Sequence, residues 1–94
     1  MIEVRRVAEG DPLRFEVAIR EGAVTTRHEV TMDRSEFAKL AADTHSAERC
    51  IEAVFRFLLD RESKEAILKH FDVAVVARYF PEFHREFPAY LVSR

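Results

Sequence analysis

The sequence predicts an α+β fold, in which a three-stranded antiparallel β-meander is followed by four to five helices packed on one face of the sheet. Residues 13–20 alternate apolar and polar side chains with the period of a half-buried strand. Beyond Met32, apolar residues recur at helical spacing, and Asp33 and Asp72 precede two of these stretches as helix caps. Because strands precede helices and do not alternate with them, we expect no parallel βαβ unit and a single domain over residues 1–94.

A two-residue turn at Glu21 and Gly22 would close a hairpin over residues 13–32 and gather its apolar side chains on one face. A first strand over about residues 2–8 would complete the meander. The register that this turn predicts pairs Ile19 with Val24, Val17 with Thr26, Phe15 with His28 and Leu13 with Val30 on the apolar face, and Glu16 with Arg27 and Arg14 with Glu29 on the other.

Helix boundaries are indicated by caps and prolines. Asp33 and Glu36 have the spacing of a capping box, Phe80 before Pro81 ends a helix, and Pro88 bounds the last one. The predicted segments are 33–42, 45–60 with Thr44 as cap, 63–69 with Ser63 as cap, 72–79 with Asp72 as cap, and a short turn over 81–86. The helix over 45–60 should be central, with an apolar arc against the core and a polar stripe of Arg49, Glu52, Arg56 and Asp60 facing water.

Composition and charge exclude several classes of protein. The chain is 48% hydrophobic and 34% charged with a formal net charge of −2, and its lysines and arginines are spread along its length. We therefore do not expect nucleic-acid binding, which concentrates cations on one surface. The first residues lack the apolar core of a signal peptide and no apolar run is long enough to span a bilayer, so we expect a cytoplasmic protein with no membrane contact.

No catalytic constellation is recognisable in the sequence. Cys50 and His45 are the elements of a nucleophilic pair, but five positions on one helix point them about 140° apart, so a buried structural thiol is expected. The four histidines have no zinc-ligand spacing. We therefore predict no catalytic residue, no metal and no cofactor.

Two surfaces are candidates for binding. The helix start at Thr44, His45 and Ser46, together with His28, could bind an anion or support a minor enzyme activity, although ordinary capping explains the same residues. The aromatic-rich C-terminal segment either closes the core or forms an interface with a partner or with a second copy of the chain. The candidate partner-binding residues there are Arg78, Tyr79, Phe83, Arg85, Phe87 and Tyr90. The leading hypothesis is a non-enzymatic protein-binding or adaptor module. The partner is either another protein or, in a homodimer, a second copy of the chain.

One stretch of the chain resembles a known group of sequences. Residues 57–68, FLLDRESKEAIL, followed by Phe71-Asp72 and by residues 78–82, RYFPE, are similar to the C-terminal half of a family of small uncharacterised bacterial proteins. The resemblance covers about residues 55–84. It implies a free-standing cytoplasmic bacterial domain and assigns no activity or catalytic residue.

Overall fold

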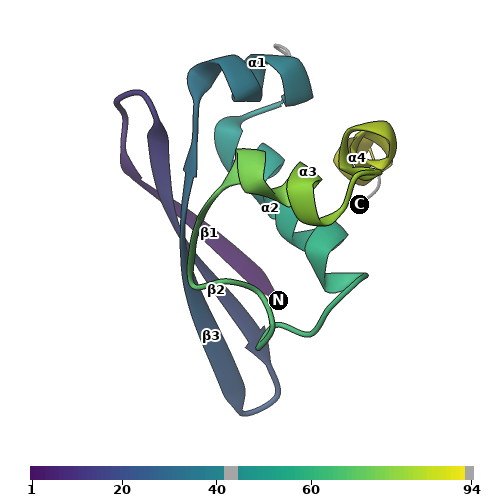
Figure 1. Cartoon of the computed structure of the whole chain (residues 1–94). Coiled ribbons are helices and arrows are strands. Elements are labelled where there is room, and N and C mark those ends of the chain that lie inside the picture. Colours follow the sequence, from purple (N-terminus) through teal and green to yellow (C-terminus); the bar gives the residue numbers. More distant parts are fainter. Residues whose placement is uncertain (42–44, 93–94) are drawn as a thin grey trace.

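The computed structural model describes residues 1–41 and 45–92, in which a four-stranded sheet carries all the helices on one of its faces (Figure 1). The predicted α+β class and the antiparallel meander are confirmed. A fourth strand pairs in parallel with the third, so the expectation of no parallel pair joined by helices is wrong. The strands, in the order they occupy in the sheet, are β1 (Ile2–Ala8), β2 (Leu13–Glu21), β3 (Val24–Met32) and β4 (His70–Asp72).

The hairpin of β2 and β3 has a different register from the predicted one. The turn residues are Gly22 and Ala23, so Glu21 pairs with Val24 and Val17 lies opposite His28. Gly22 has a φ of +60°, which a two-residue hairpin turn requires at its first position and which glycine adopts without steric cost. Each β3 residue is thereby displaced by two positions, and a shift of two leaves the apolar face unchanged.

The helices agree with the predicted segments except near residues 63–69 and at the C-terminus. Asp72 caps the 3₁₀ turn as predicted, because its side chain accepts a hydrogen bond from the Ala74 N–H at 3.0 Å. Residues 63–69 form turns and no helix. The observed elements are α1 (Arg34–Ala41), α2 (Ala47–Leu59), the 3₁₀ helix η1 (Val73–Val75), α3 (Val76–Tyr79) and α4 (Phe83–Val92).

Helix α2 is the centre of the core, as predicted. It lies between the sheet and α4 (Figure 1), and its apolar arc is buried. Phe55 faces the sheet side, where its ring lies 5.7 Å from that of Phe71 on β4, whereas Phe57 faces α4 and lies 5.0 Å from the ring of Phe83. Two aromatic clusters therefore sandwich the helix. The buried residues of α2 are Ala47, Cys50, Ile51, Ala53, Val54, Phe55, Phe57 and Leu58.

Helix α4 continues through Pro88, which was expected to end it. Proline inside a helix removes one backbone hydrogen bond, at a cost of about 3 kcal/mol. Burial of Phe83, Phe87 and Leu91, spaced four residues apart on one face, offsets that cost.

The longer α4 also changes the surroundings of the polar stripe of α2. Arg49 donates a hydrogen bond to the carbonyl of Leu91 at 3.0 Å, and Arg56 donates to that of Tyr90 at 2.6 Å. Both arginines are half-buried, so the prediction that this side of α2 faces water is wrong for them. Cations are favourable at the carbonyl end of a helix, where they complement the helix dipole. No helix within the described ranges is long and apolar enough to cross a membrane.

Candidate functional site

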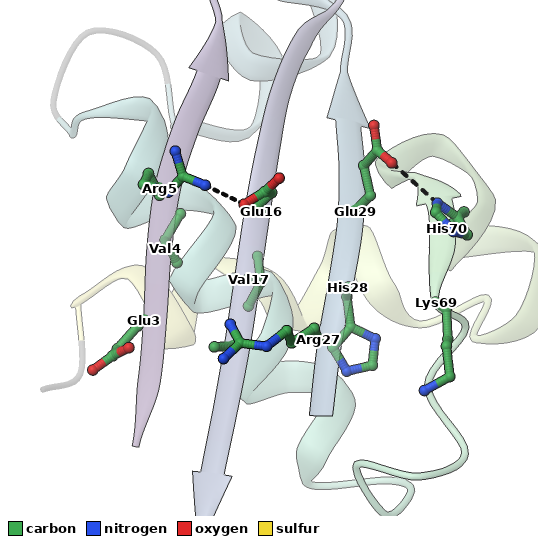
Figure 2. A pocket seen from close by; sticks show the side chains of 11 residues that line it. Glu3, Val4, Arg5, Glu16, Val17, Arg27, His28, Glu29, Lys69 and His70 are labelled. Carbon is green, nitrogen blue, oxygen red and sulfur yellow. Dashed lines mark hydrogen bonds and ion pairs between the residues drawn. The ribbon is translucent and has the colours of Figure 1, made fainter. Parts of the chain in front are cut away.

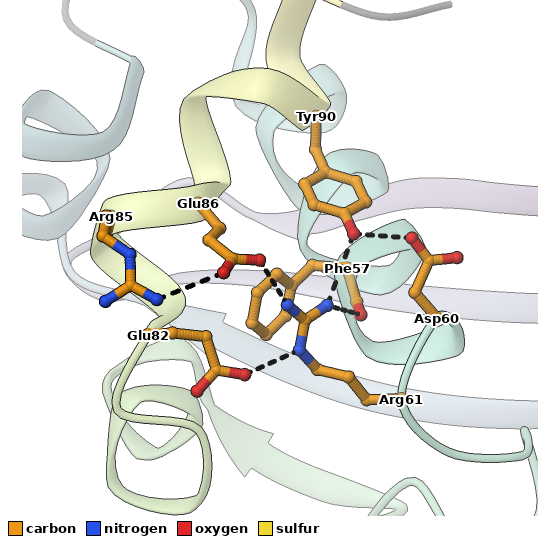
Figure 3. A network of polar contacts seen from close by, with 7 residues as sticks. All are labelled: Phe57, Asp60, Arg61, Glu82, Arg85, Glu86 and Tyr90. Carbon is orange, nitrogen blue, oxygen red and sulfur yellow. Dashed lines mark hydrogen bonds and ion pairs between the residues drawn. The ribbon is translucent and has the colours of Figure 1, made fainter.

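Arg61, just beyond the end of α2, organises a network of polar contacts that holds α4 (Figure 3). Its guanidinium donates to Glu82 at 2.9 Å and to Glu86 at 2.6 Å. It also donates to the Phe57 carbonyl at 3.1 Å and to the Tyr90 hydroxyl at 3.3 Å, and it lies 3.7 Å from the centre of the Phe57 ring. We call Phe57, Asp60, Arg61, Glu82, Glu86 and Tyr90 the Arg61 network.

Electrostatics in this network favour a structural role. The hydrogen bond from Arg61 holds the pKa of Glu82 below its ordinary value, so this carboxylate stays charged and paired. The Tyr90 hydroxyl donates to Asp60 at 2.5 Å. Because each of these polar groups has a partner inside the network, none is poised to act on a substrate. The network therefore holds α4 against the end of α2.

The predicted aromatic interface divides between the core and the surface. Phe83 and Phe87 are 0% and 1% exposed, so the expectation that they contact a partner is wrong, and the alternative expectation of a core position is correct for them. They are buried because α4 continues past Pro88 and turns this face onto α2. Tyr90 is half-buried in the Arg61 network. Of the six candidate residues, Arg78, Tyr79 and Arg85 are exposed.

Tyr79 borders an apolar groove that the sequence did not predict. The groove has a volume of about 330 Å³ and lies between the end of α2, the segment 61–69 and the η1–α3 unit. Tyr79 is 66% exposed and Leu68 49% exposed, whereas Phe71 and Phe80 are half-buried beneath them. The apolar groove is lined by Leu58, Glu62, Ala66, Ile67, Leu68, Phe71, Val75, Val76, Tyr79 and Phe80.

The groove exists because the segment 61–69 does not form the predicted helix. Lys64 is buried and donates to Glu21 at the tip of the hairpin at 3.2 Å. The Lys69 carbonyl accepts a hydrogen bond from the Glu29 N–H of β3 at 2.7 Å. A helix of seven residues is only marginally stable by itself, so these hydrogen bonds to the sheet determine the path of segment 61–69. The segment crosses the end of α2 and leaves Leu68 beside α3.

Glu62 places a carboxylate in this groove. It is half-buried, and no hydrogen bond or ion pair involves its side chain within residues 1–41 and 45–92. Burial raises the pKa of Glu62, because a charged carboxylate loses hydration among apolar side chains. This acid is thus unlike Glu82 and Glu86, which Arg61 neutralises.

His28 is a buried part of the structure and is held by contacts within the fold. The residue is 3% exposed, and its ring lies 5.5 Å from that of Phe55. Its Nδ1 lies 2.8 Å from the Leu68 carbonyl, which can only accept, so Nδ1 carries the hydrogen. Nε2 is then the acceptor for the Thr26 hydroxyl at 3.0 Å. Both ring nitrogens of the neutral imidazole are satisfied.

The folded state should lose stability as the pH is lowered, because His28 resists protonation in the folded chain. Burial, reinforced by the charge of Lys69, lowers the pKa of His28 from 6.5, although its bond to Leu68 opposes the shift. Below pH 6.5 the unfolded chain therefore binds a proton that the folded chain resists, and the free energy of unfolding decreases as the pH falls. Urea unfolding between pH 7.5 and 5 should reveal this loss.

The control variants separate His28 from the other histidines. His28→Gln should flatten the dependence of the unfolding free energy on pH across this interval. His70→Gln makes the same change at an exposed histidine paired with Glu29 and is the matched variant with which His28→Gln is compared. An unchanged slope in His28→Gln would show that this histidine does not titrate with folding.

The predicted anion site at the start of α2 is not assembled with His28. Ser46 is the cap of the helix, since its hydroxyl accepts from the Arg49 N–H at 3.1 Å, and His45 lies before the helix. Thr44, the predicted cap, lies outside the described residues. The nine residues from Ser46 to Phe55, which contacts His28, span roughly 13 Å along the helix axis. His28 and Ser46 therefore cannot bind one small anion.

The outer face of the sheet has a larger hollow of about 560 Å³ (Figure 2). Ala18 lies between Glu3 and Arg27 in the pairing of the strands, and its small side chain leaves the space. Figure 2 shows the Arg27 side chain lying across β2. Arg27 and Lys69 form no ion pair within residues 1–41 and 45–92, and two exposed cations alone do not build an anion site. The other charges around the hollow form ion pairs. These pairs are Arg5 with Glu16, Arg20 with Glu3, Arg14 with Glu29 and His70 with Glu29.

The remaining chemical groups do not form a reactive centre. Cys50 is fully buried, and its Sγ lies 3.9 Å from the Sδ of Met32. Burial raises the pKa of the Cys50 thiol to about 12, so it is not a nucleophile at neutral pH. Within the described part of the chain, no group of three or more histidine, cysteine or acidic residues could hold a metal ion.

Comparison with protein-family models, with curated proteins and with solved structures found no match to this chain. The resemblance of residues 55–84 to small bacterial proteins stays a prediction.

Proposed function

We propose that this chain is a non-enzymatic protein-binding module and that the apolar groove is its binding surface. The observation that carries the proposal is the exposure of Leu68 and Tyr79, at 49% and 66%, directly beside the half-buried rings of Phe71 and Phe80. Contiguous apolar surface of this kind is unfavourable in water and is typical of interaction sites. Aromatic side chains contribute strongly to protein interfaces.

The burial of the two groups best suited to catalysis supports a non-enzymatic role. Cys50 is held as a neutral thiol, and His28 uses both ring nitrogens within the core. Neither is accessible to a substrate. The proposed binding surface is therefore the groove and not the C-terminal aromatic segment as a whole. Of the aromatic residues predicted to form an interface, only Tyr79 borders the groove.

The proposal is tested by a matched pair of charge substitutions on exposed apolar residues. Leu68→Asp places a charge in the groove, and Val24→Asp places one on the hairpin, where Val24 is 51% exposed. Immobilised wild-type protein and both variants would be used to capture partners, with quantitative mass spectrometry of the proteins retained. Proteins retained by wild type and Val24→Asp should be lost from Leu68→Asp, with circular dichroism confirming that both variants fold.

An identical set of captured proteins on all three would contradict the proposal. Sedimentation velocity on the same samples measures self-association. A dimer of wild type that Leu68→Asp disrupts would identify the homodimeric version of this function.

A further inference from the structure

The carboxylate of Glu62 is the specific feature of the apolar groove. A wholly apolar groove would select partners only by shape and hydrophobicity. Here one acidic group is half-buried among Leu58, Phe71 and Phe80, without a side-chain partner in the described part of the chain. An occupant that covers the groove removes more water from this carboxylate, which is costly unless the occupant supplies a compensating charge or donor.

Cations stand beside the groove in the sequence but do not neutralise Glu62. Lys69 follows Leu68, and Arg78 precedes Tyr79; both are exposed, and neither forms an ion pair within the described ranges. Neither residue lines the groove, and Lys69 lines the hollow on the outer face of the sheet. Glu62 is the charged residue of the groove lining, so charge complementarity is best with a single cation over Glu62.

The size of the groove limits what can occupy it. Its volume of about 330 Å³ is at the lower end of the range of roughly 300–1,000 Å³ that is typical of small-molecule pockets. It is open along the surface between α2 and α3, so a few adjacent side chains of a peptide fit it better than an enclosed ligand.

We propose that the groove binds a peptide segment of a partner protein in which apolar anchor residues flank one lysine or arginine, and that this cation pairs with Glu62. The inference rests on the proposed function and specifies its partner. Apolar anchors fill the space over Phe71 and Phe80, and the cation compensates the carboxylate that they bury. The pair then provides selectivity, because an apolar segment without the cation leaves Glu62 buried and unpaired.

A phage-displayed library of random 12-residue peptides provides the test. Selection on wild-type protein should enrich peptides with two or more large apolar residues and one basic residue. Synthetic versions of the enriched peptides would then be titrated by fluorescence anisotropy. Glu62→Gln should weaken their binding about tenfold or more, whereas Glu52→Gln, at a half-buried carboxylate of α2 outside the groove, should leave the affinity unchanged.

A charge exchange provides an independent measurement. Glu62→Lys should reject the enriched peptides and should bind versions in which glutamate replaces the basic residue. Wild type should show the opposite preference. Circular dichroism establishes that each variant is folded before titration.

The outcomes distinguish this inference from the proposed function. Peptides that lose binding to Leu68→Asp but bind wild type and Glu62→Gln equally would overturn the role of the cation and leave the protein-binding function standing. Enriched peptides that bind Leu68→Asp as well as wild type, or a library that yields no binder, would overturn both. A wild-type dimer that forms through the groove would also overturn this inference, because the occupant would then be a second copy of the chain.

Discussion

Replacing Phe57 with alanine should lower the free energy of unfolding by about 3–5 kcal/mol, because the ring is fully buried at the contact of α2 with α4. It packs edge-on against Phe80, Phe83 and Tyr90, and its face is covered by Arg61. A domain typically has only about 5–15 kcal/mol of total stability, so the variant should lose a large fraction of it. Urea unfolding followed by far-UV circular dichroism measures the change, since the chain has no tryptophan.

Two further variants keep this prediction testable. Phe57→Leu retains part of the buried volume and should lose less stability, so it can be measured even if the alanine variant does not fold. Tyr79→Ala, at an aromatic residue that is 66% exposed, should change the free energy of unfolding by no more than about 0.5 kcal/mol. Equal losses in Phe57→Ala and Tyr79→Ala would contradict the described packing of α4.

Replacing Arg61 with methionine should cost about 2–4 kcal/mol of stability. The side chain is only 18% exposed, and its loss leaves Glu82 and Glu86 without their shared cation. It also removes the donors to the Phe57 carbonyl and the Tyr90 hydroxyl. Breaking a partly buried ion pair from one side is costly because the remaining charges stay desolvated. Urea unfolding at pH 7 measures the change.

The pH dependence of this loss identifies its cause. The pKa of Glu82 is held below its ordinary value of 4.5 by Arg61, so the contribution of the pair is complete above that pH and is lost as the pH falls below it. The difference in unfolding free energy between wild type and Arg61→Met should therefore shrink between about pH 5 and pH 3. A constant difference would contradict the ionic origin of the effect.

Arginine controls separate the geometry of this network from charge alone. Arg85→Met removes a side chain that is 74% exposed and, within residues 1–41 and 45–92, has one ion pair, to Glu86, so its effect should stay within about 1 kcal/mol. Arg61→Lys keeps the charge but lacks the planar fork that reaches two carboxylates, and it should be less stable than wild type and more stable than Arg61→Met.

The faces of the strands were predictable from the sequence, but the hairpin register was not. Alternation in residues 13–20 determines which side chains are buried, because successive residues in a strand point to opposite faces. The register depends on which two residues form the turn. Charge pairing of Glu16 with Arg27 favoured the wrong register, and the structure instead pairs Glu16 with Arg5 on β1.

Helix α2 was predictable because its apolar arc extends over more than three turns. Residues 63–69 were not, because a short helical pattern is weak and contacts of Lys64 and Lys69 with the sheet override it. Strand β4 has only three residues, too few to display an alternating pattern. Pro88 was a misleading boundary, because burial of α4 against α2 outweighs one lost hydrogen bond.

By itself, then, the sequence determined the fold class, the buried faces of the strands and the central place of α2, because periodicity and caps act over neighbouring residues. Only the tertiary structure decided that Phe83 and Phe87 belong to the core and that Tyr79 borders a groove. The groove joins residues from three separate segments, and Glu62 gains its character from the apolar side chains they bring together. Such a site depends on the path of residues 61–69, which is determined by hydrogen bonds to the distant strands β2 and β3 and which local patterns do not encode.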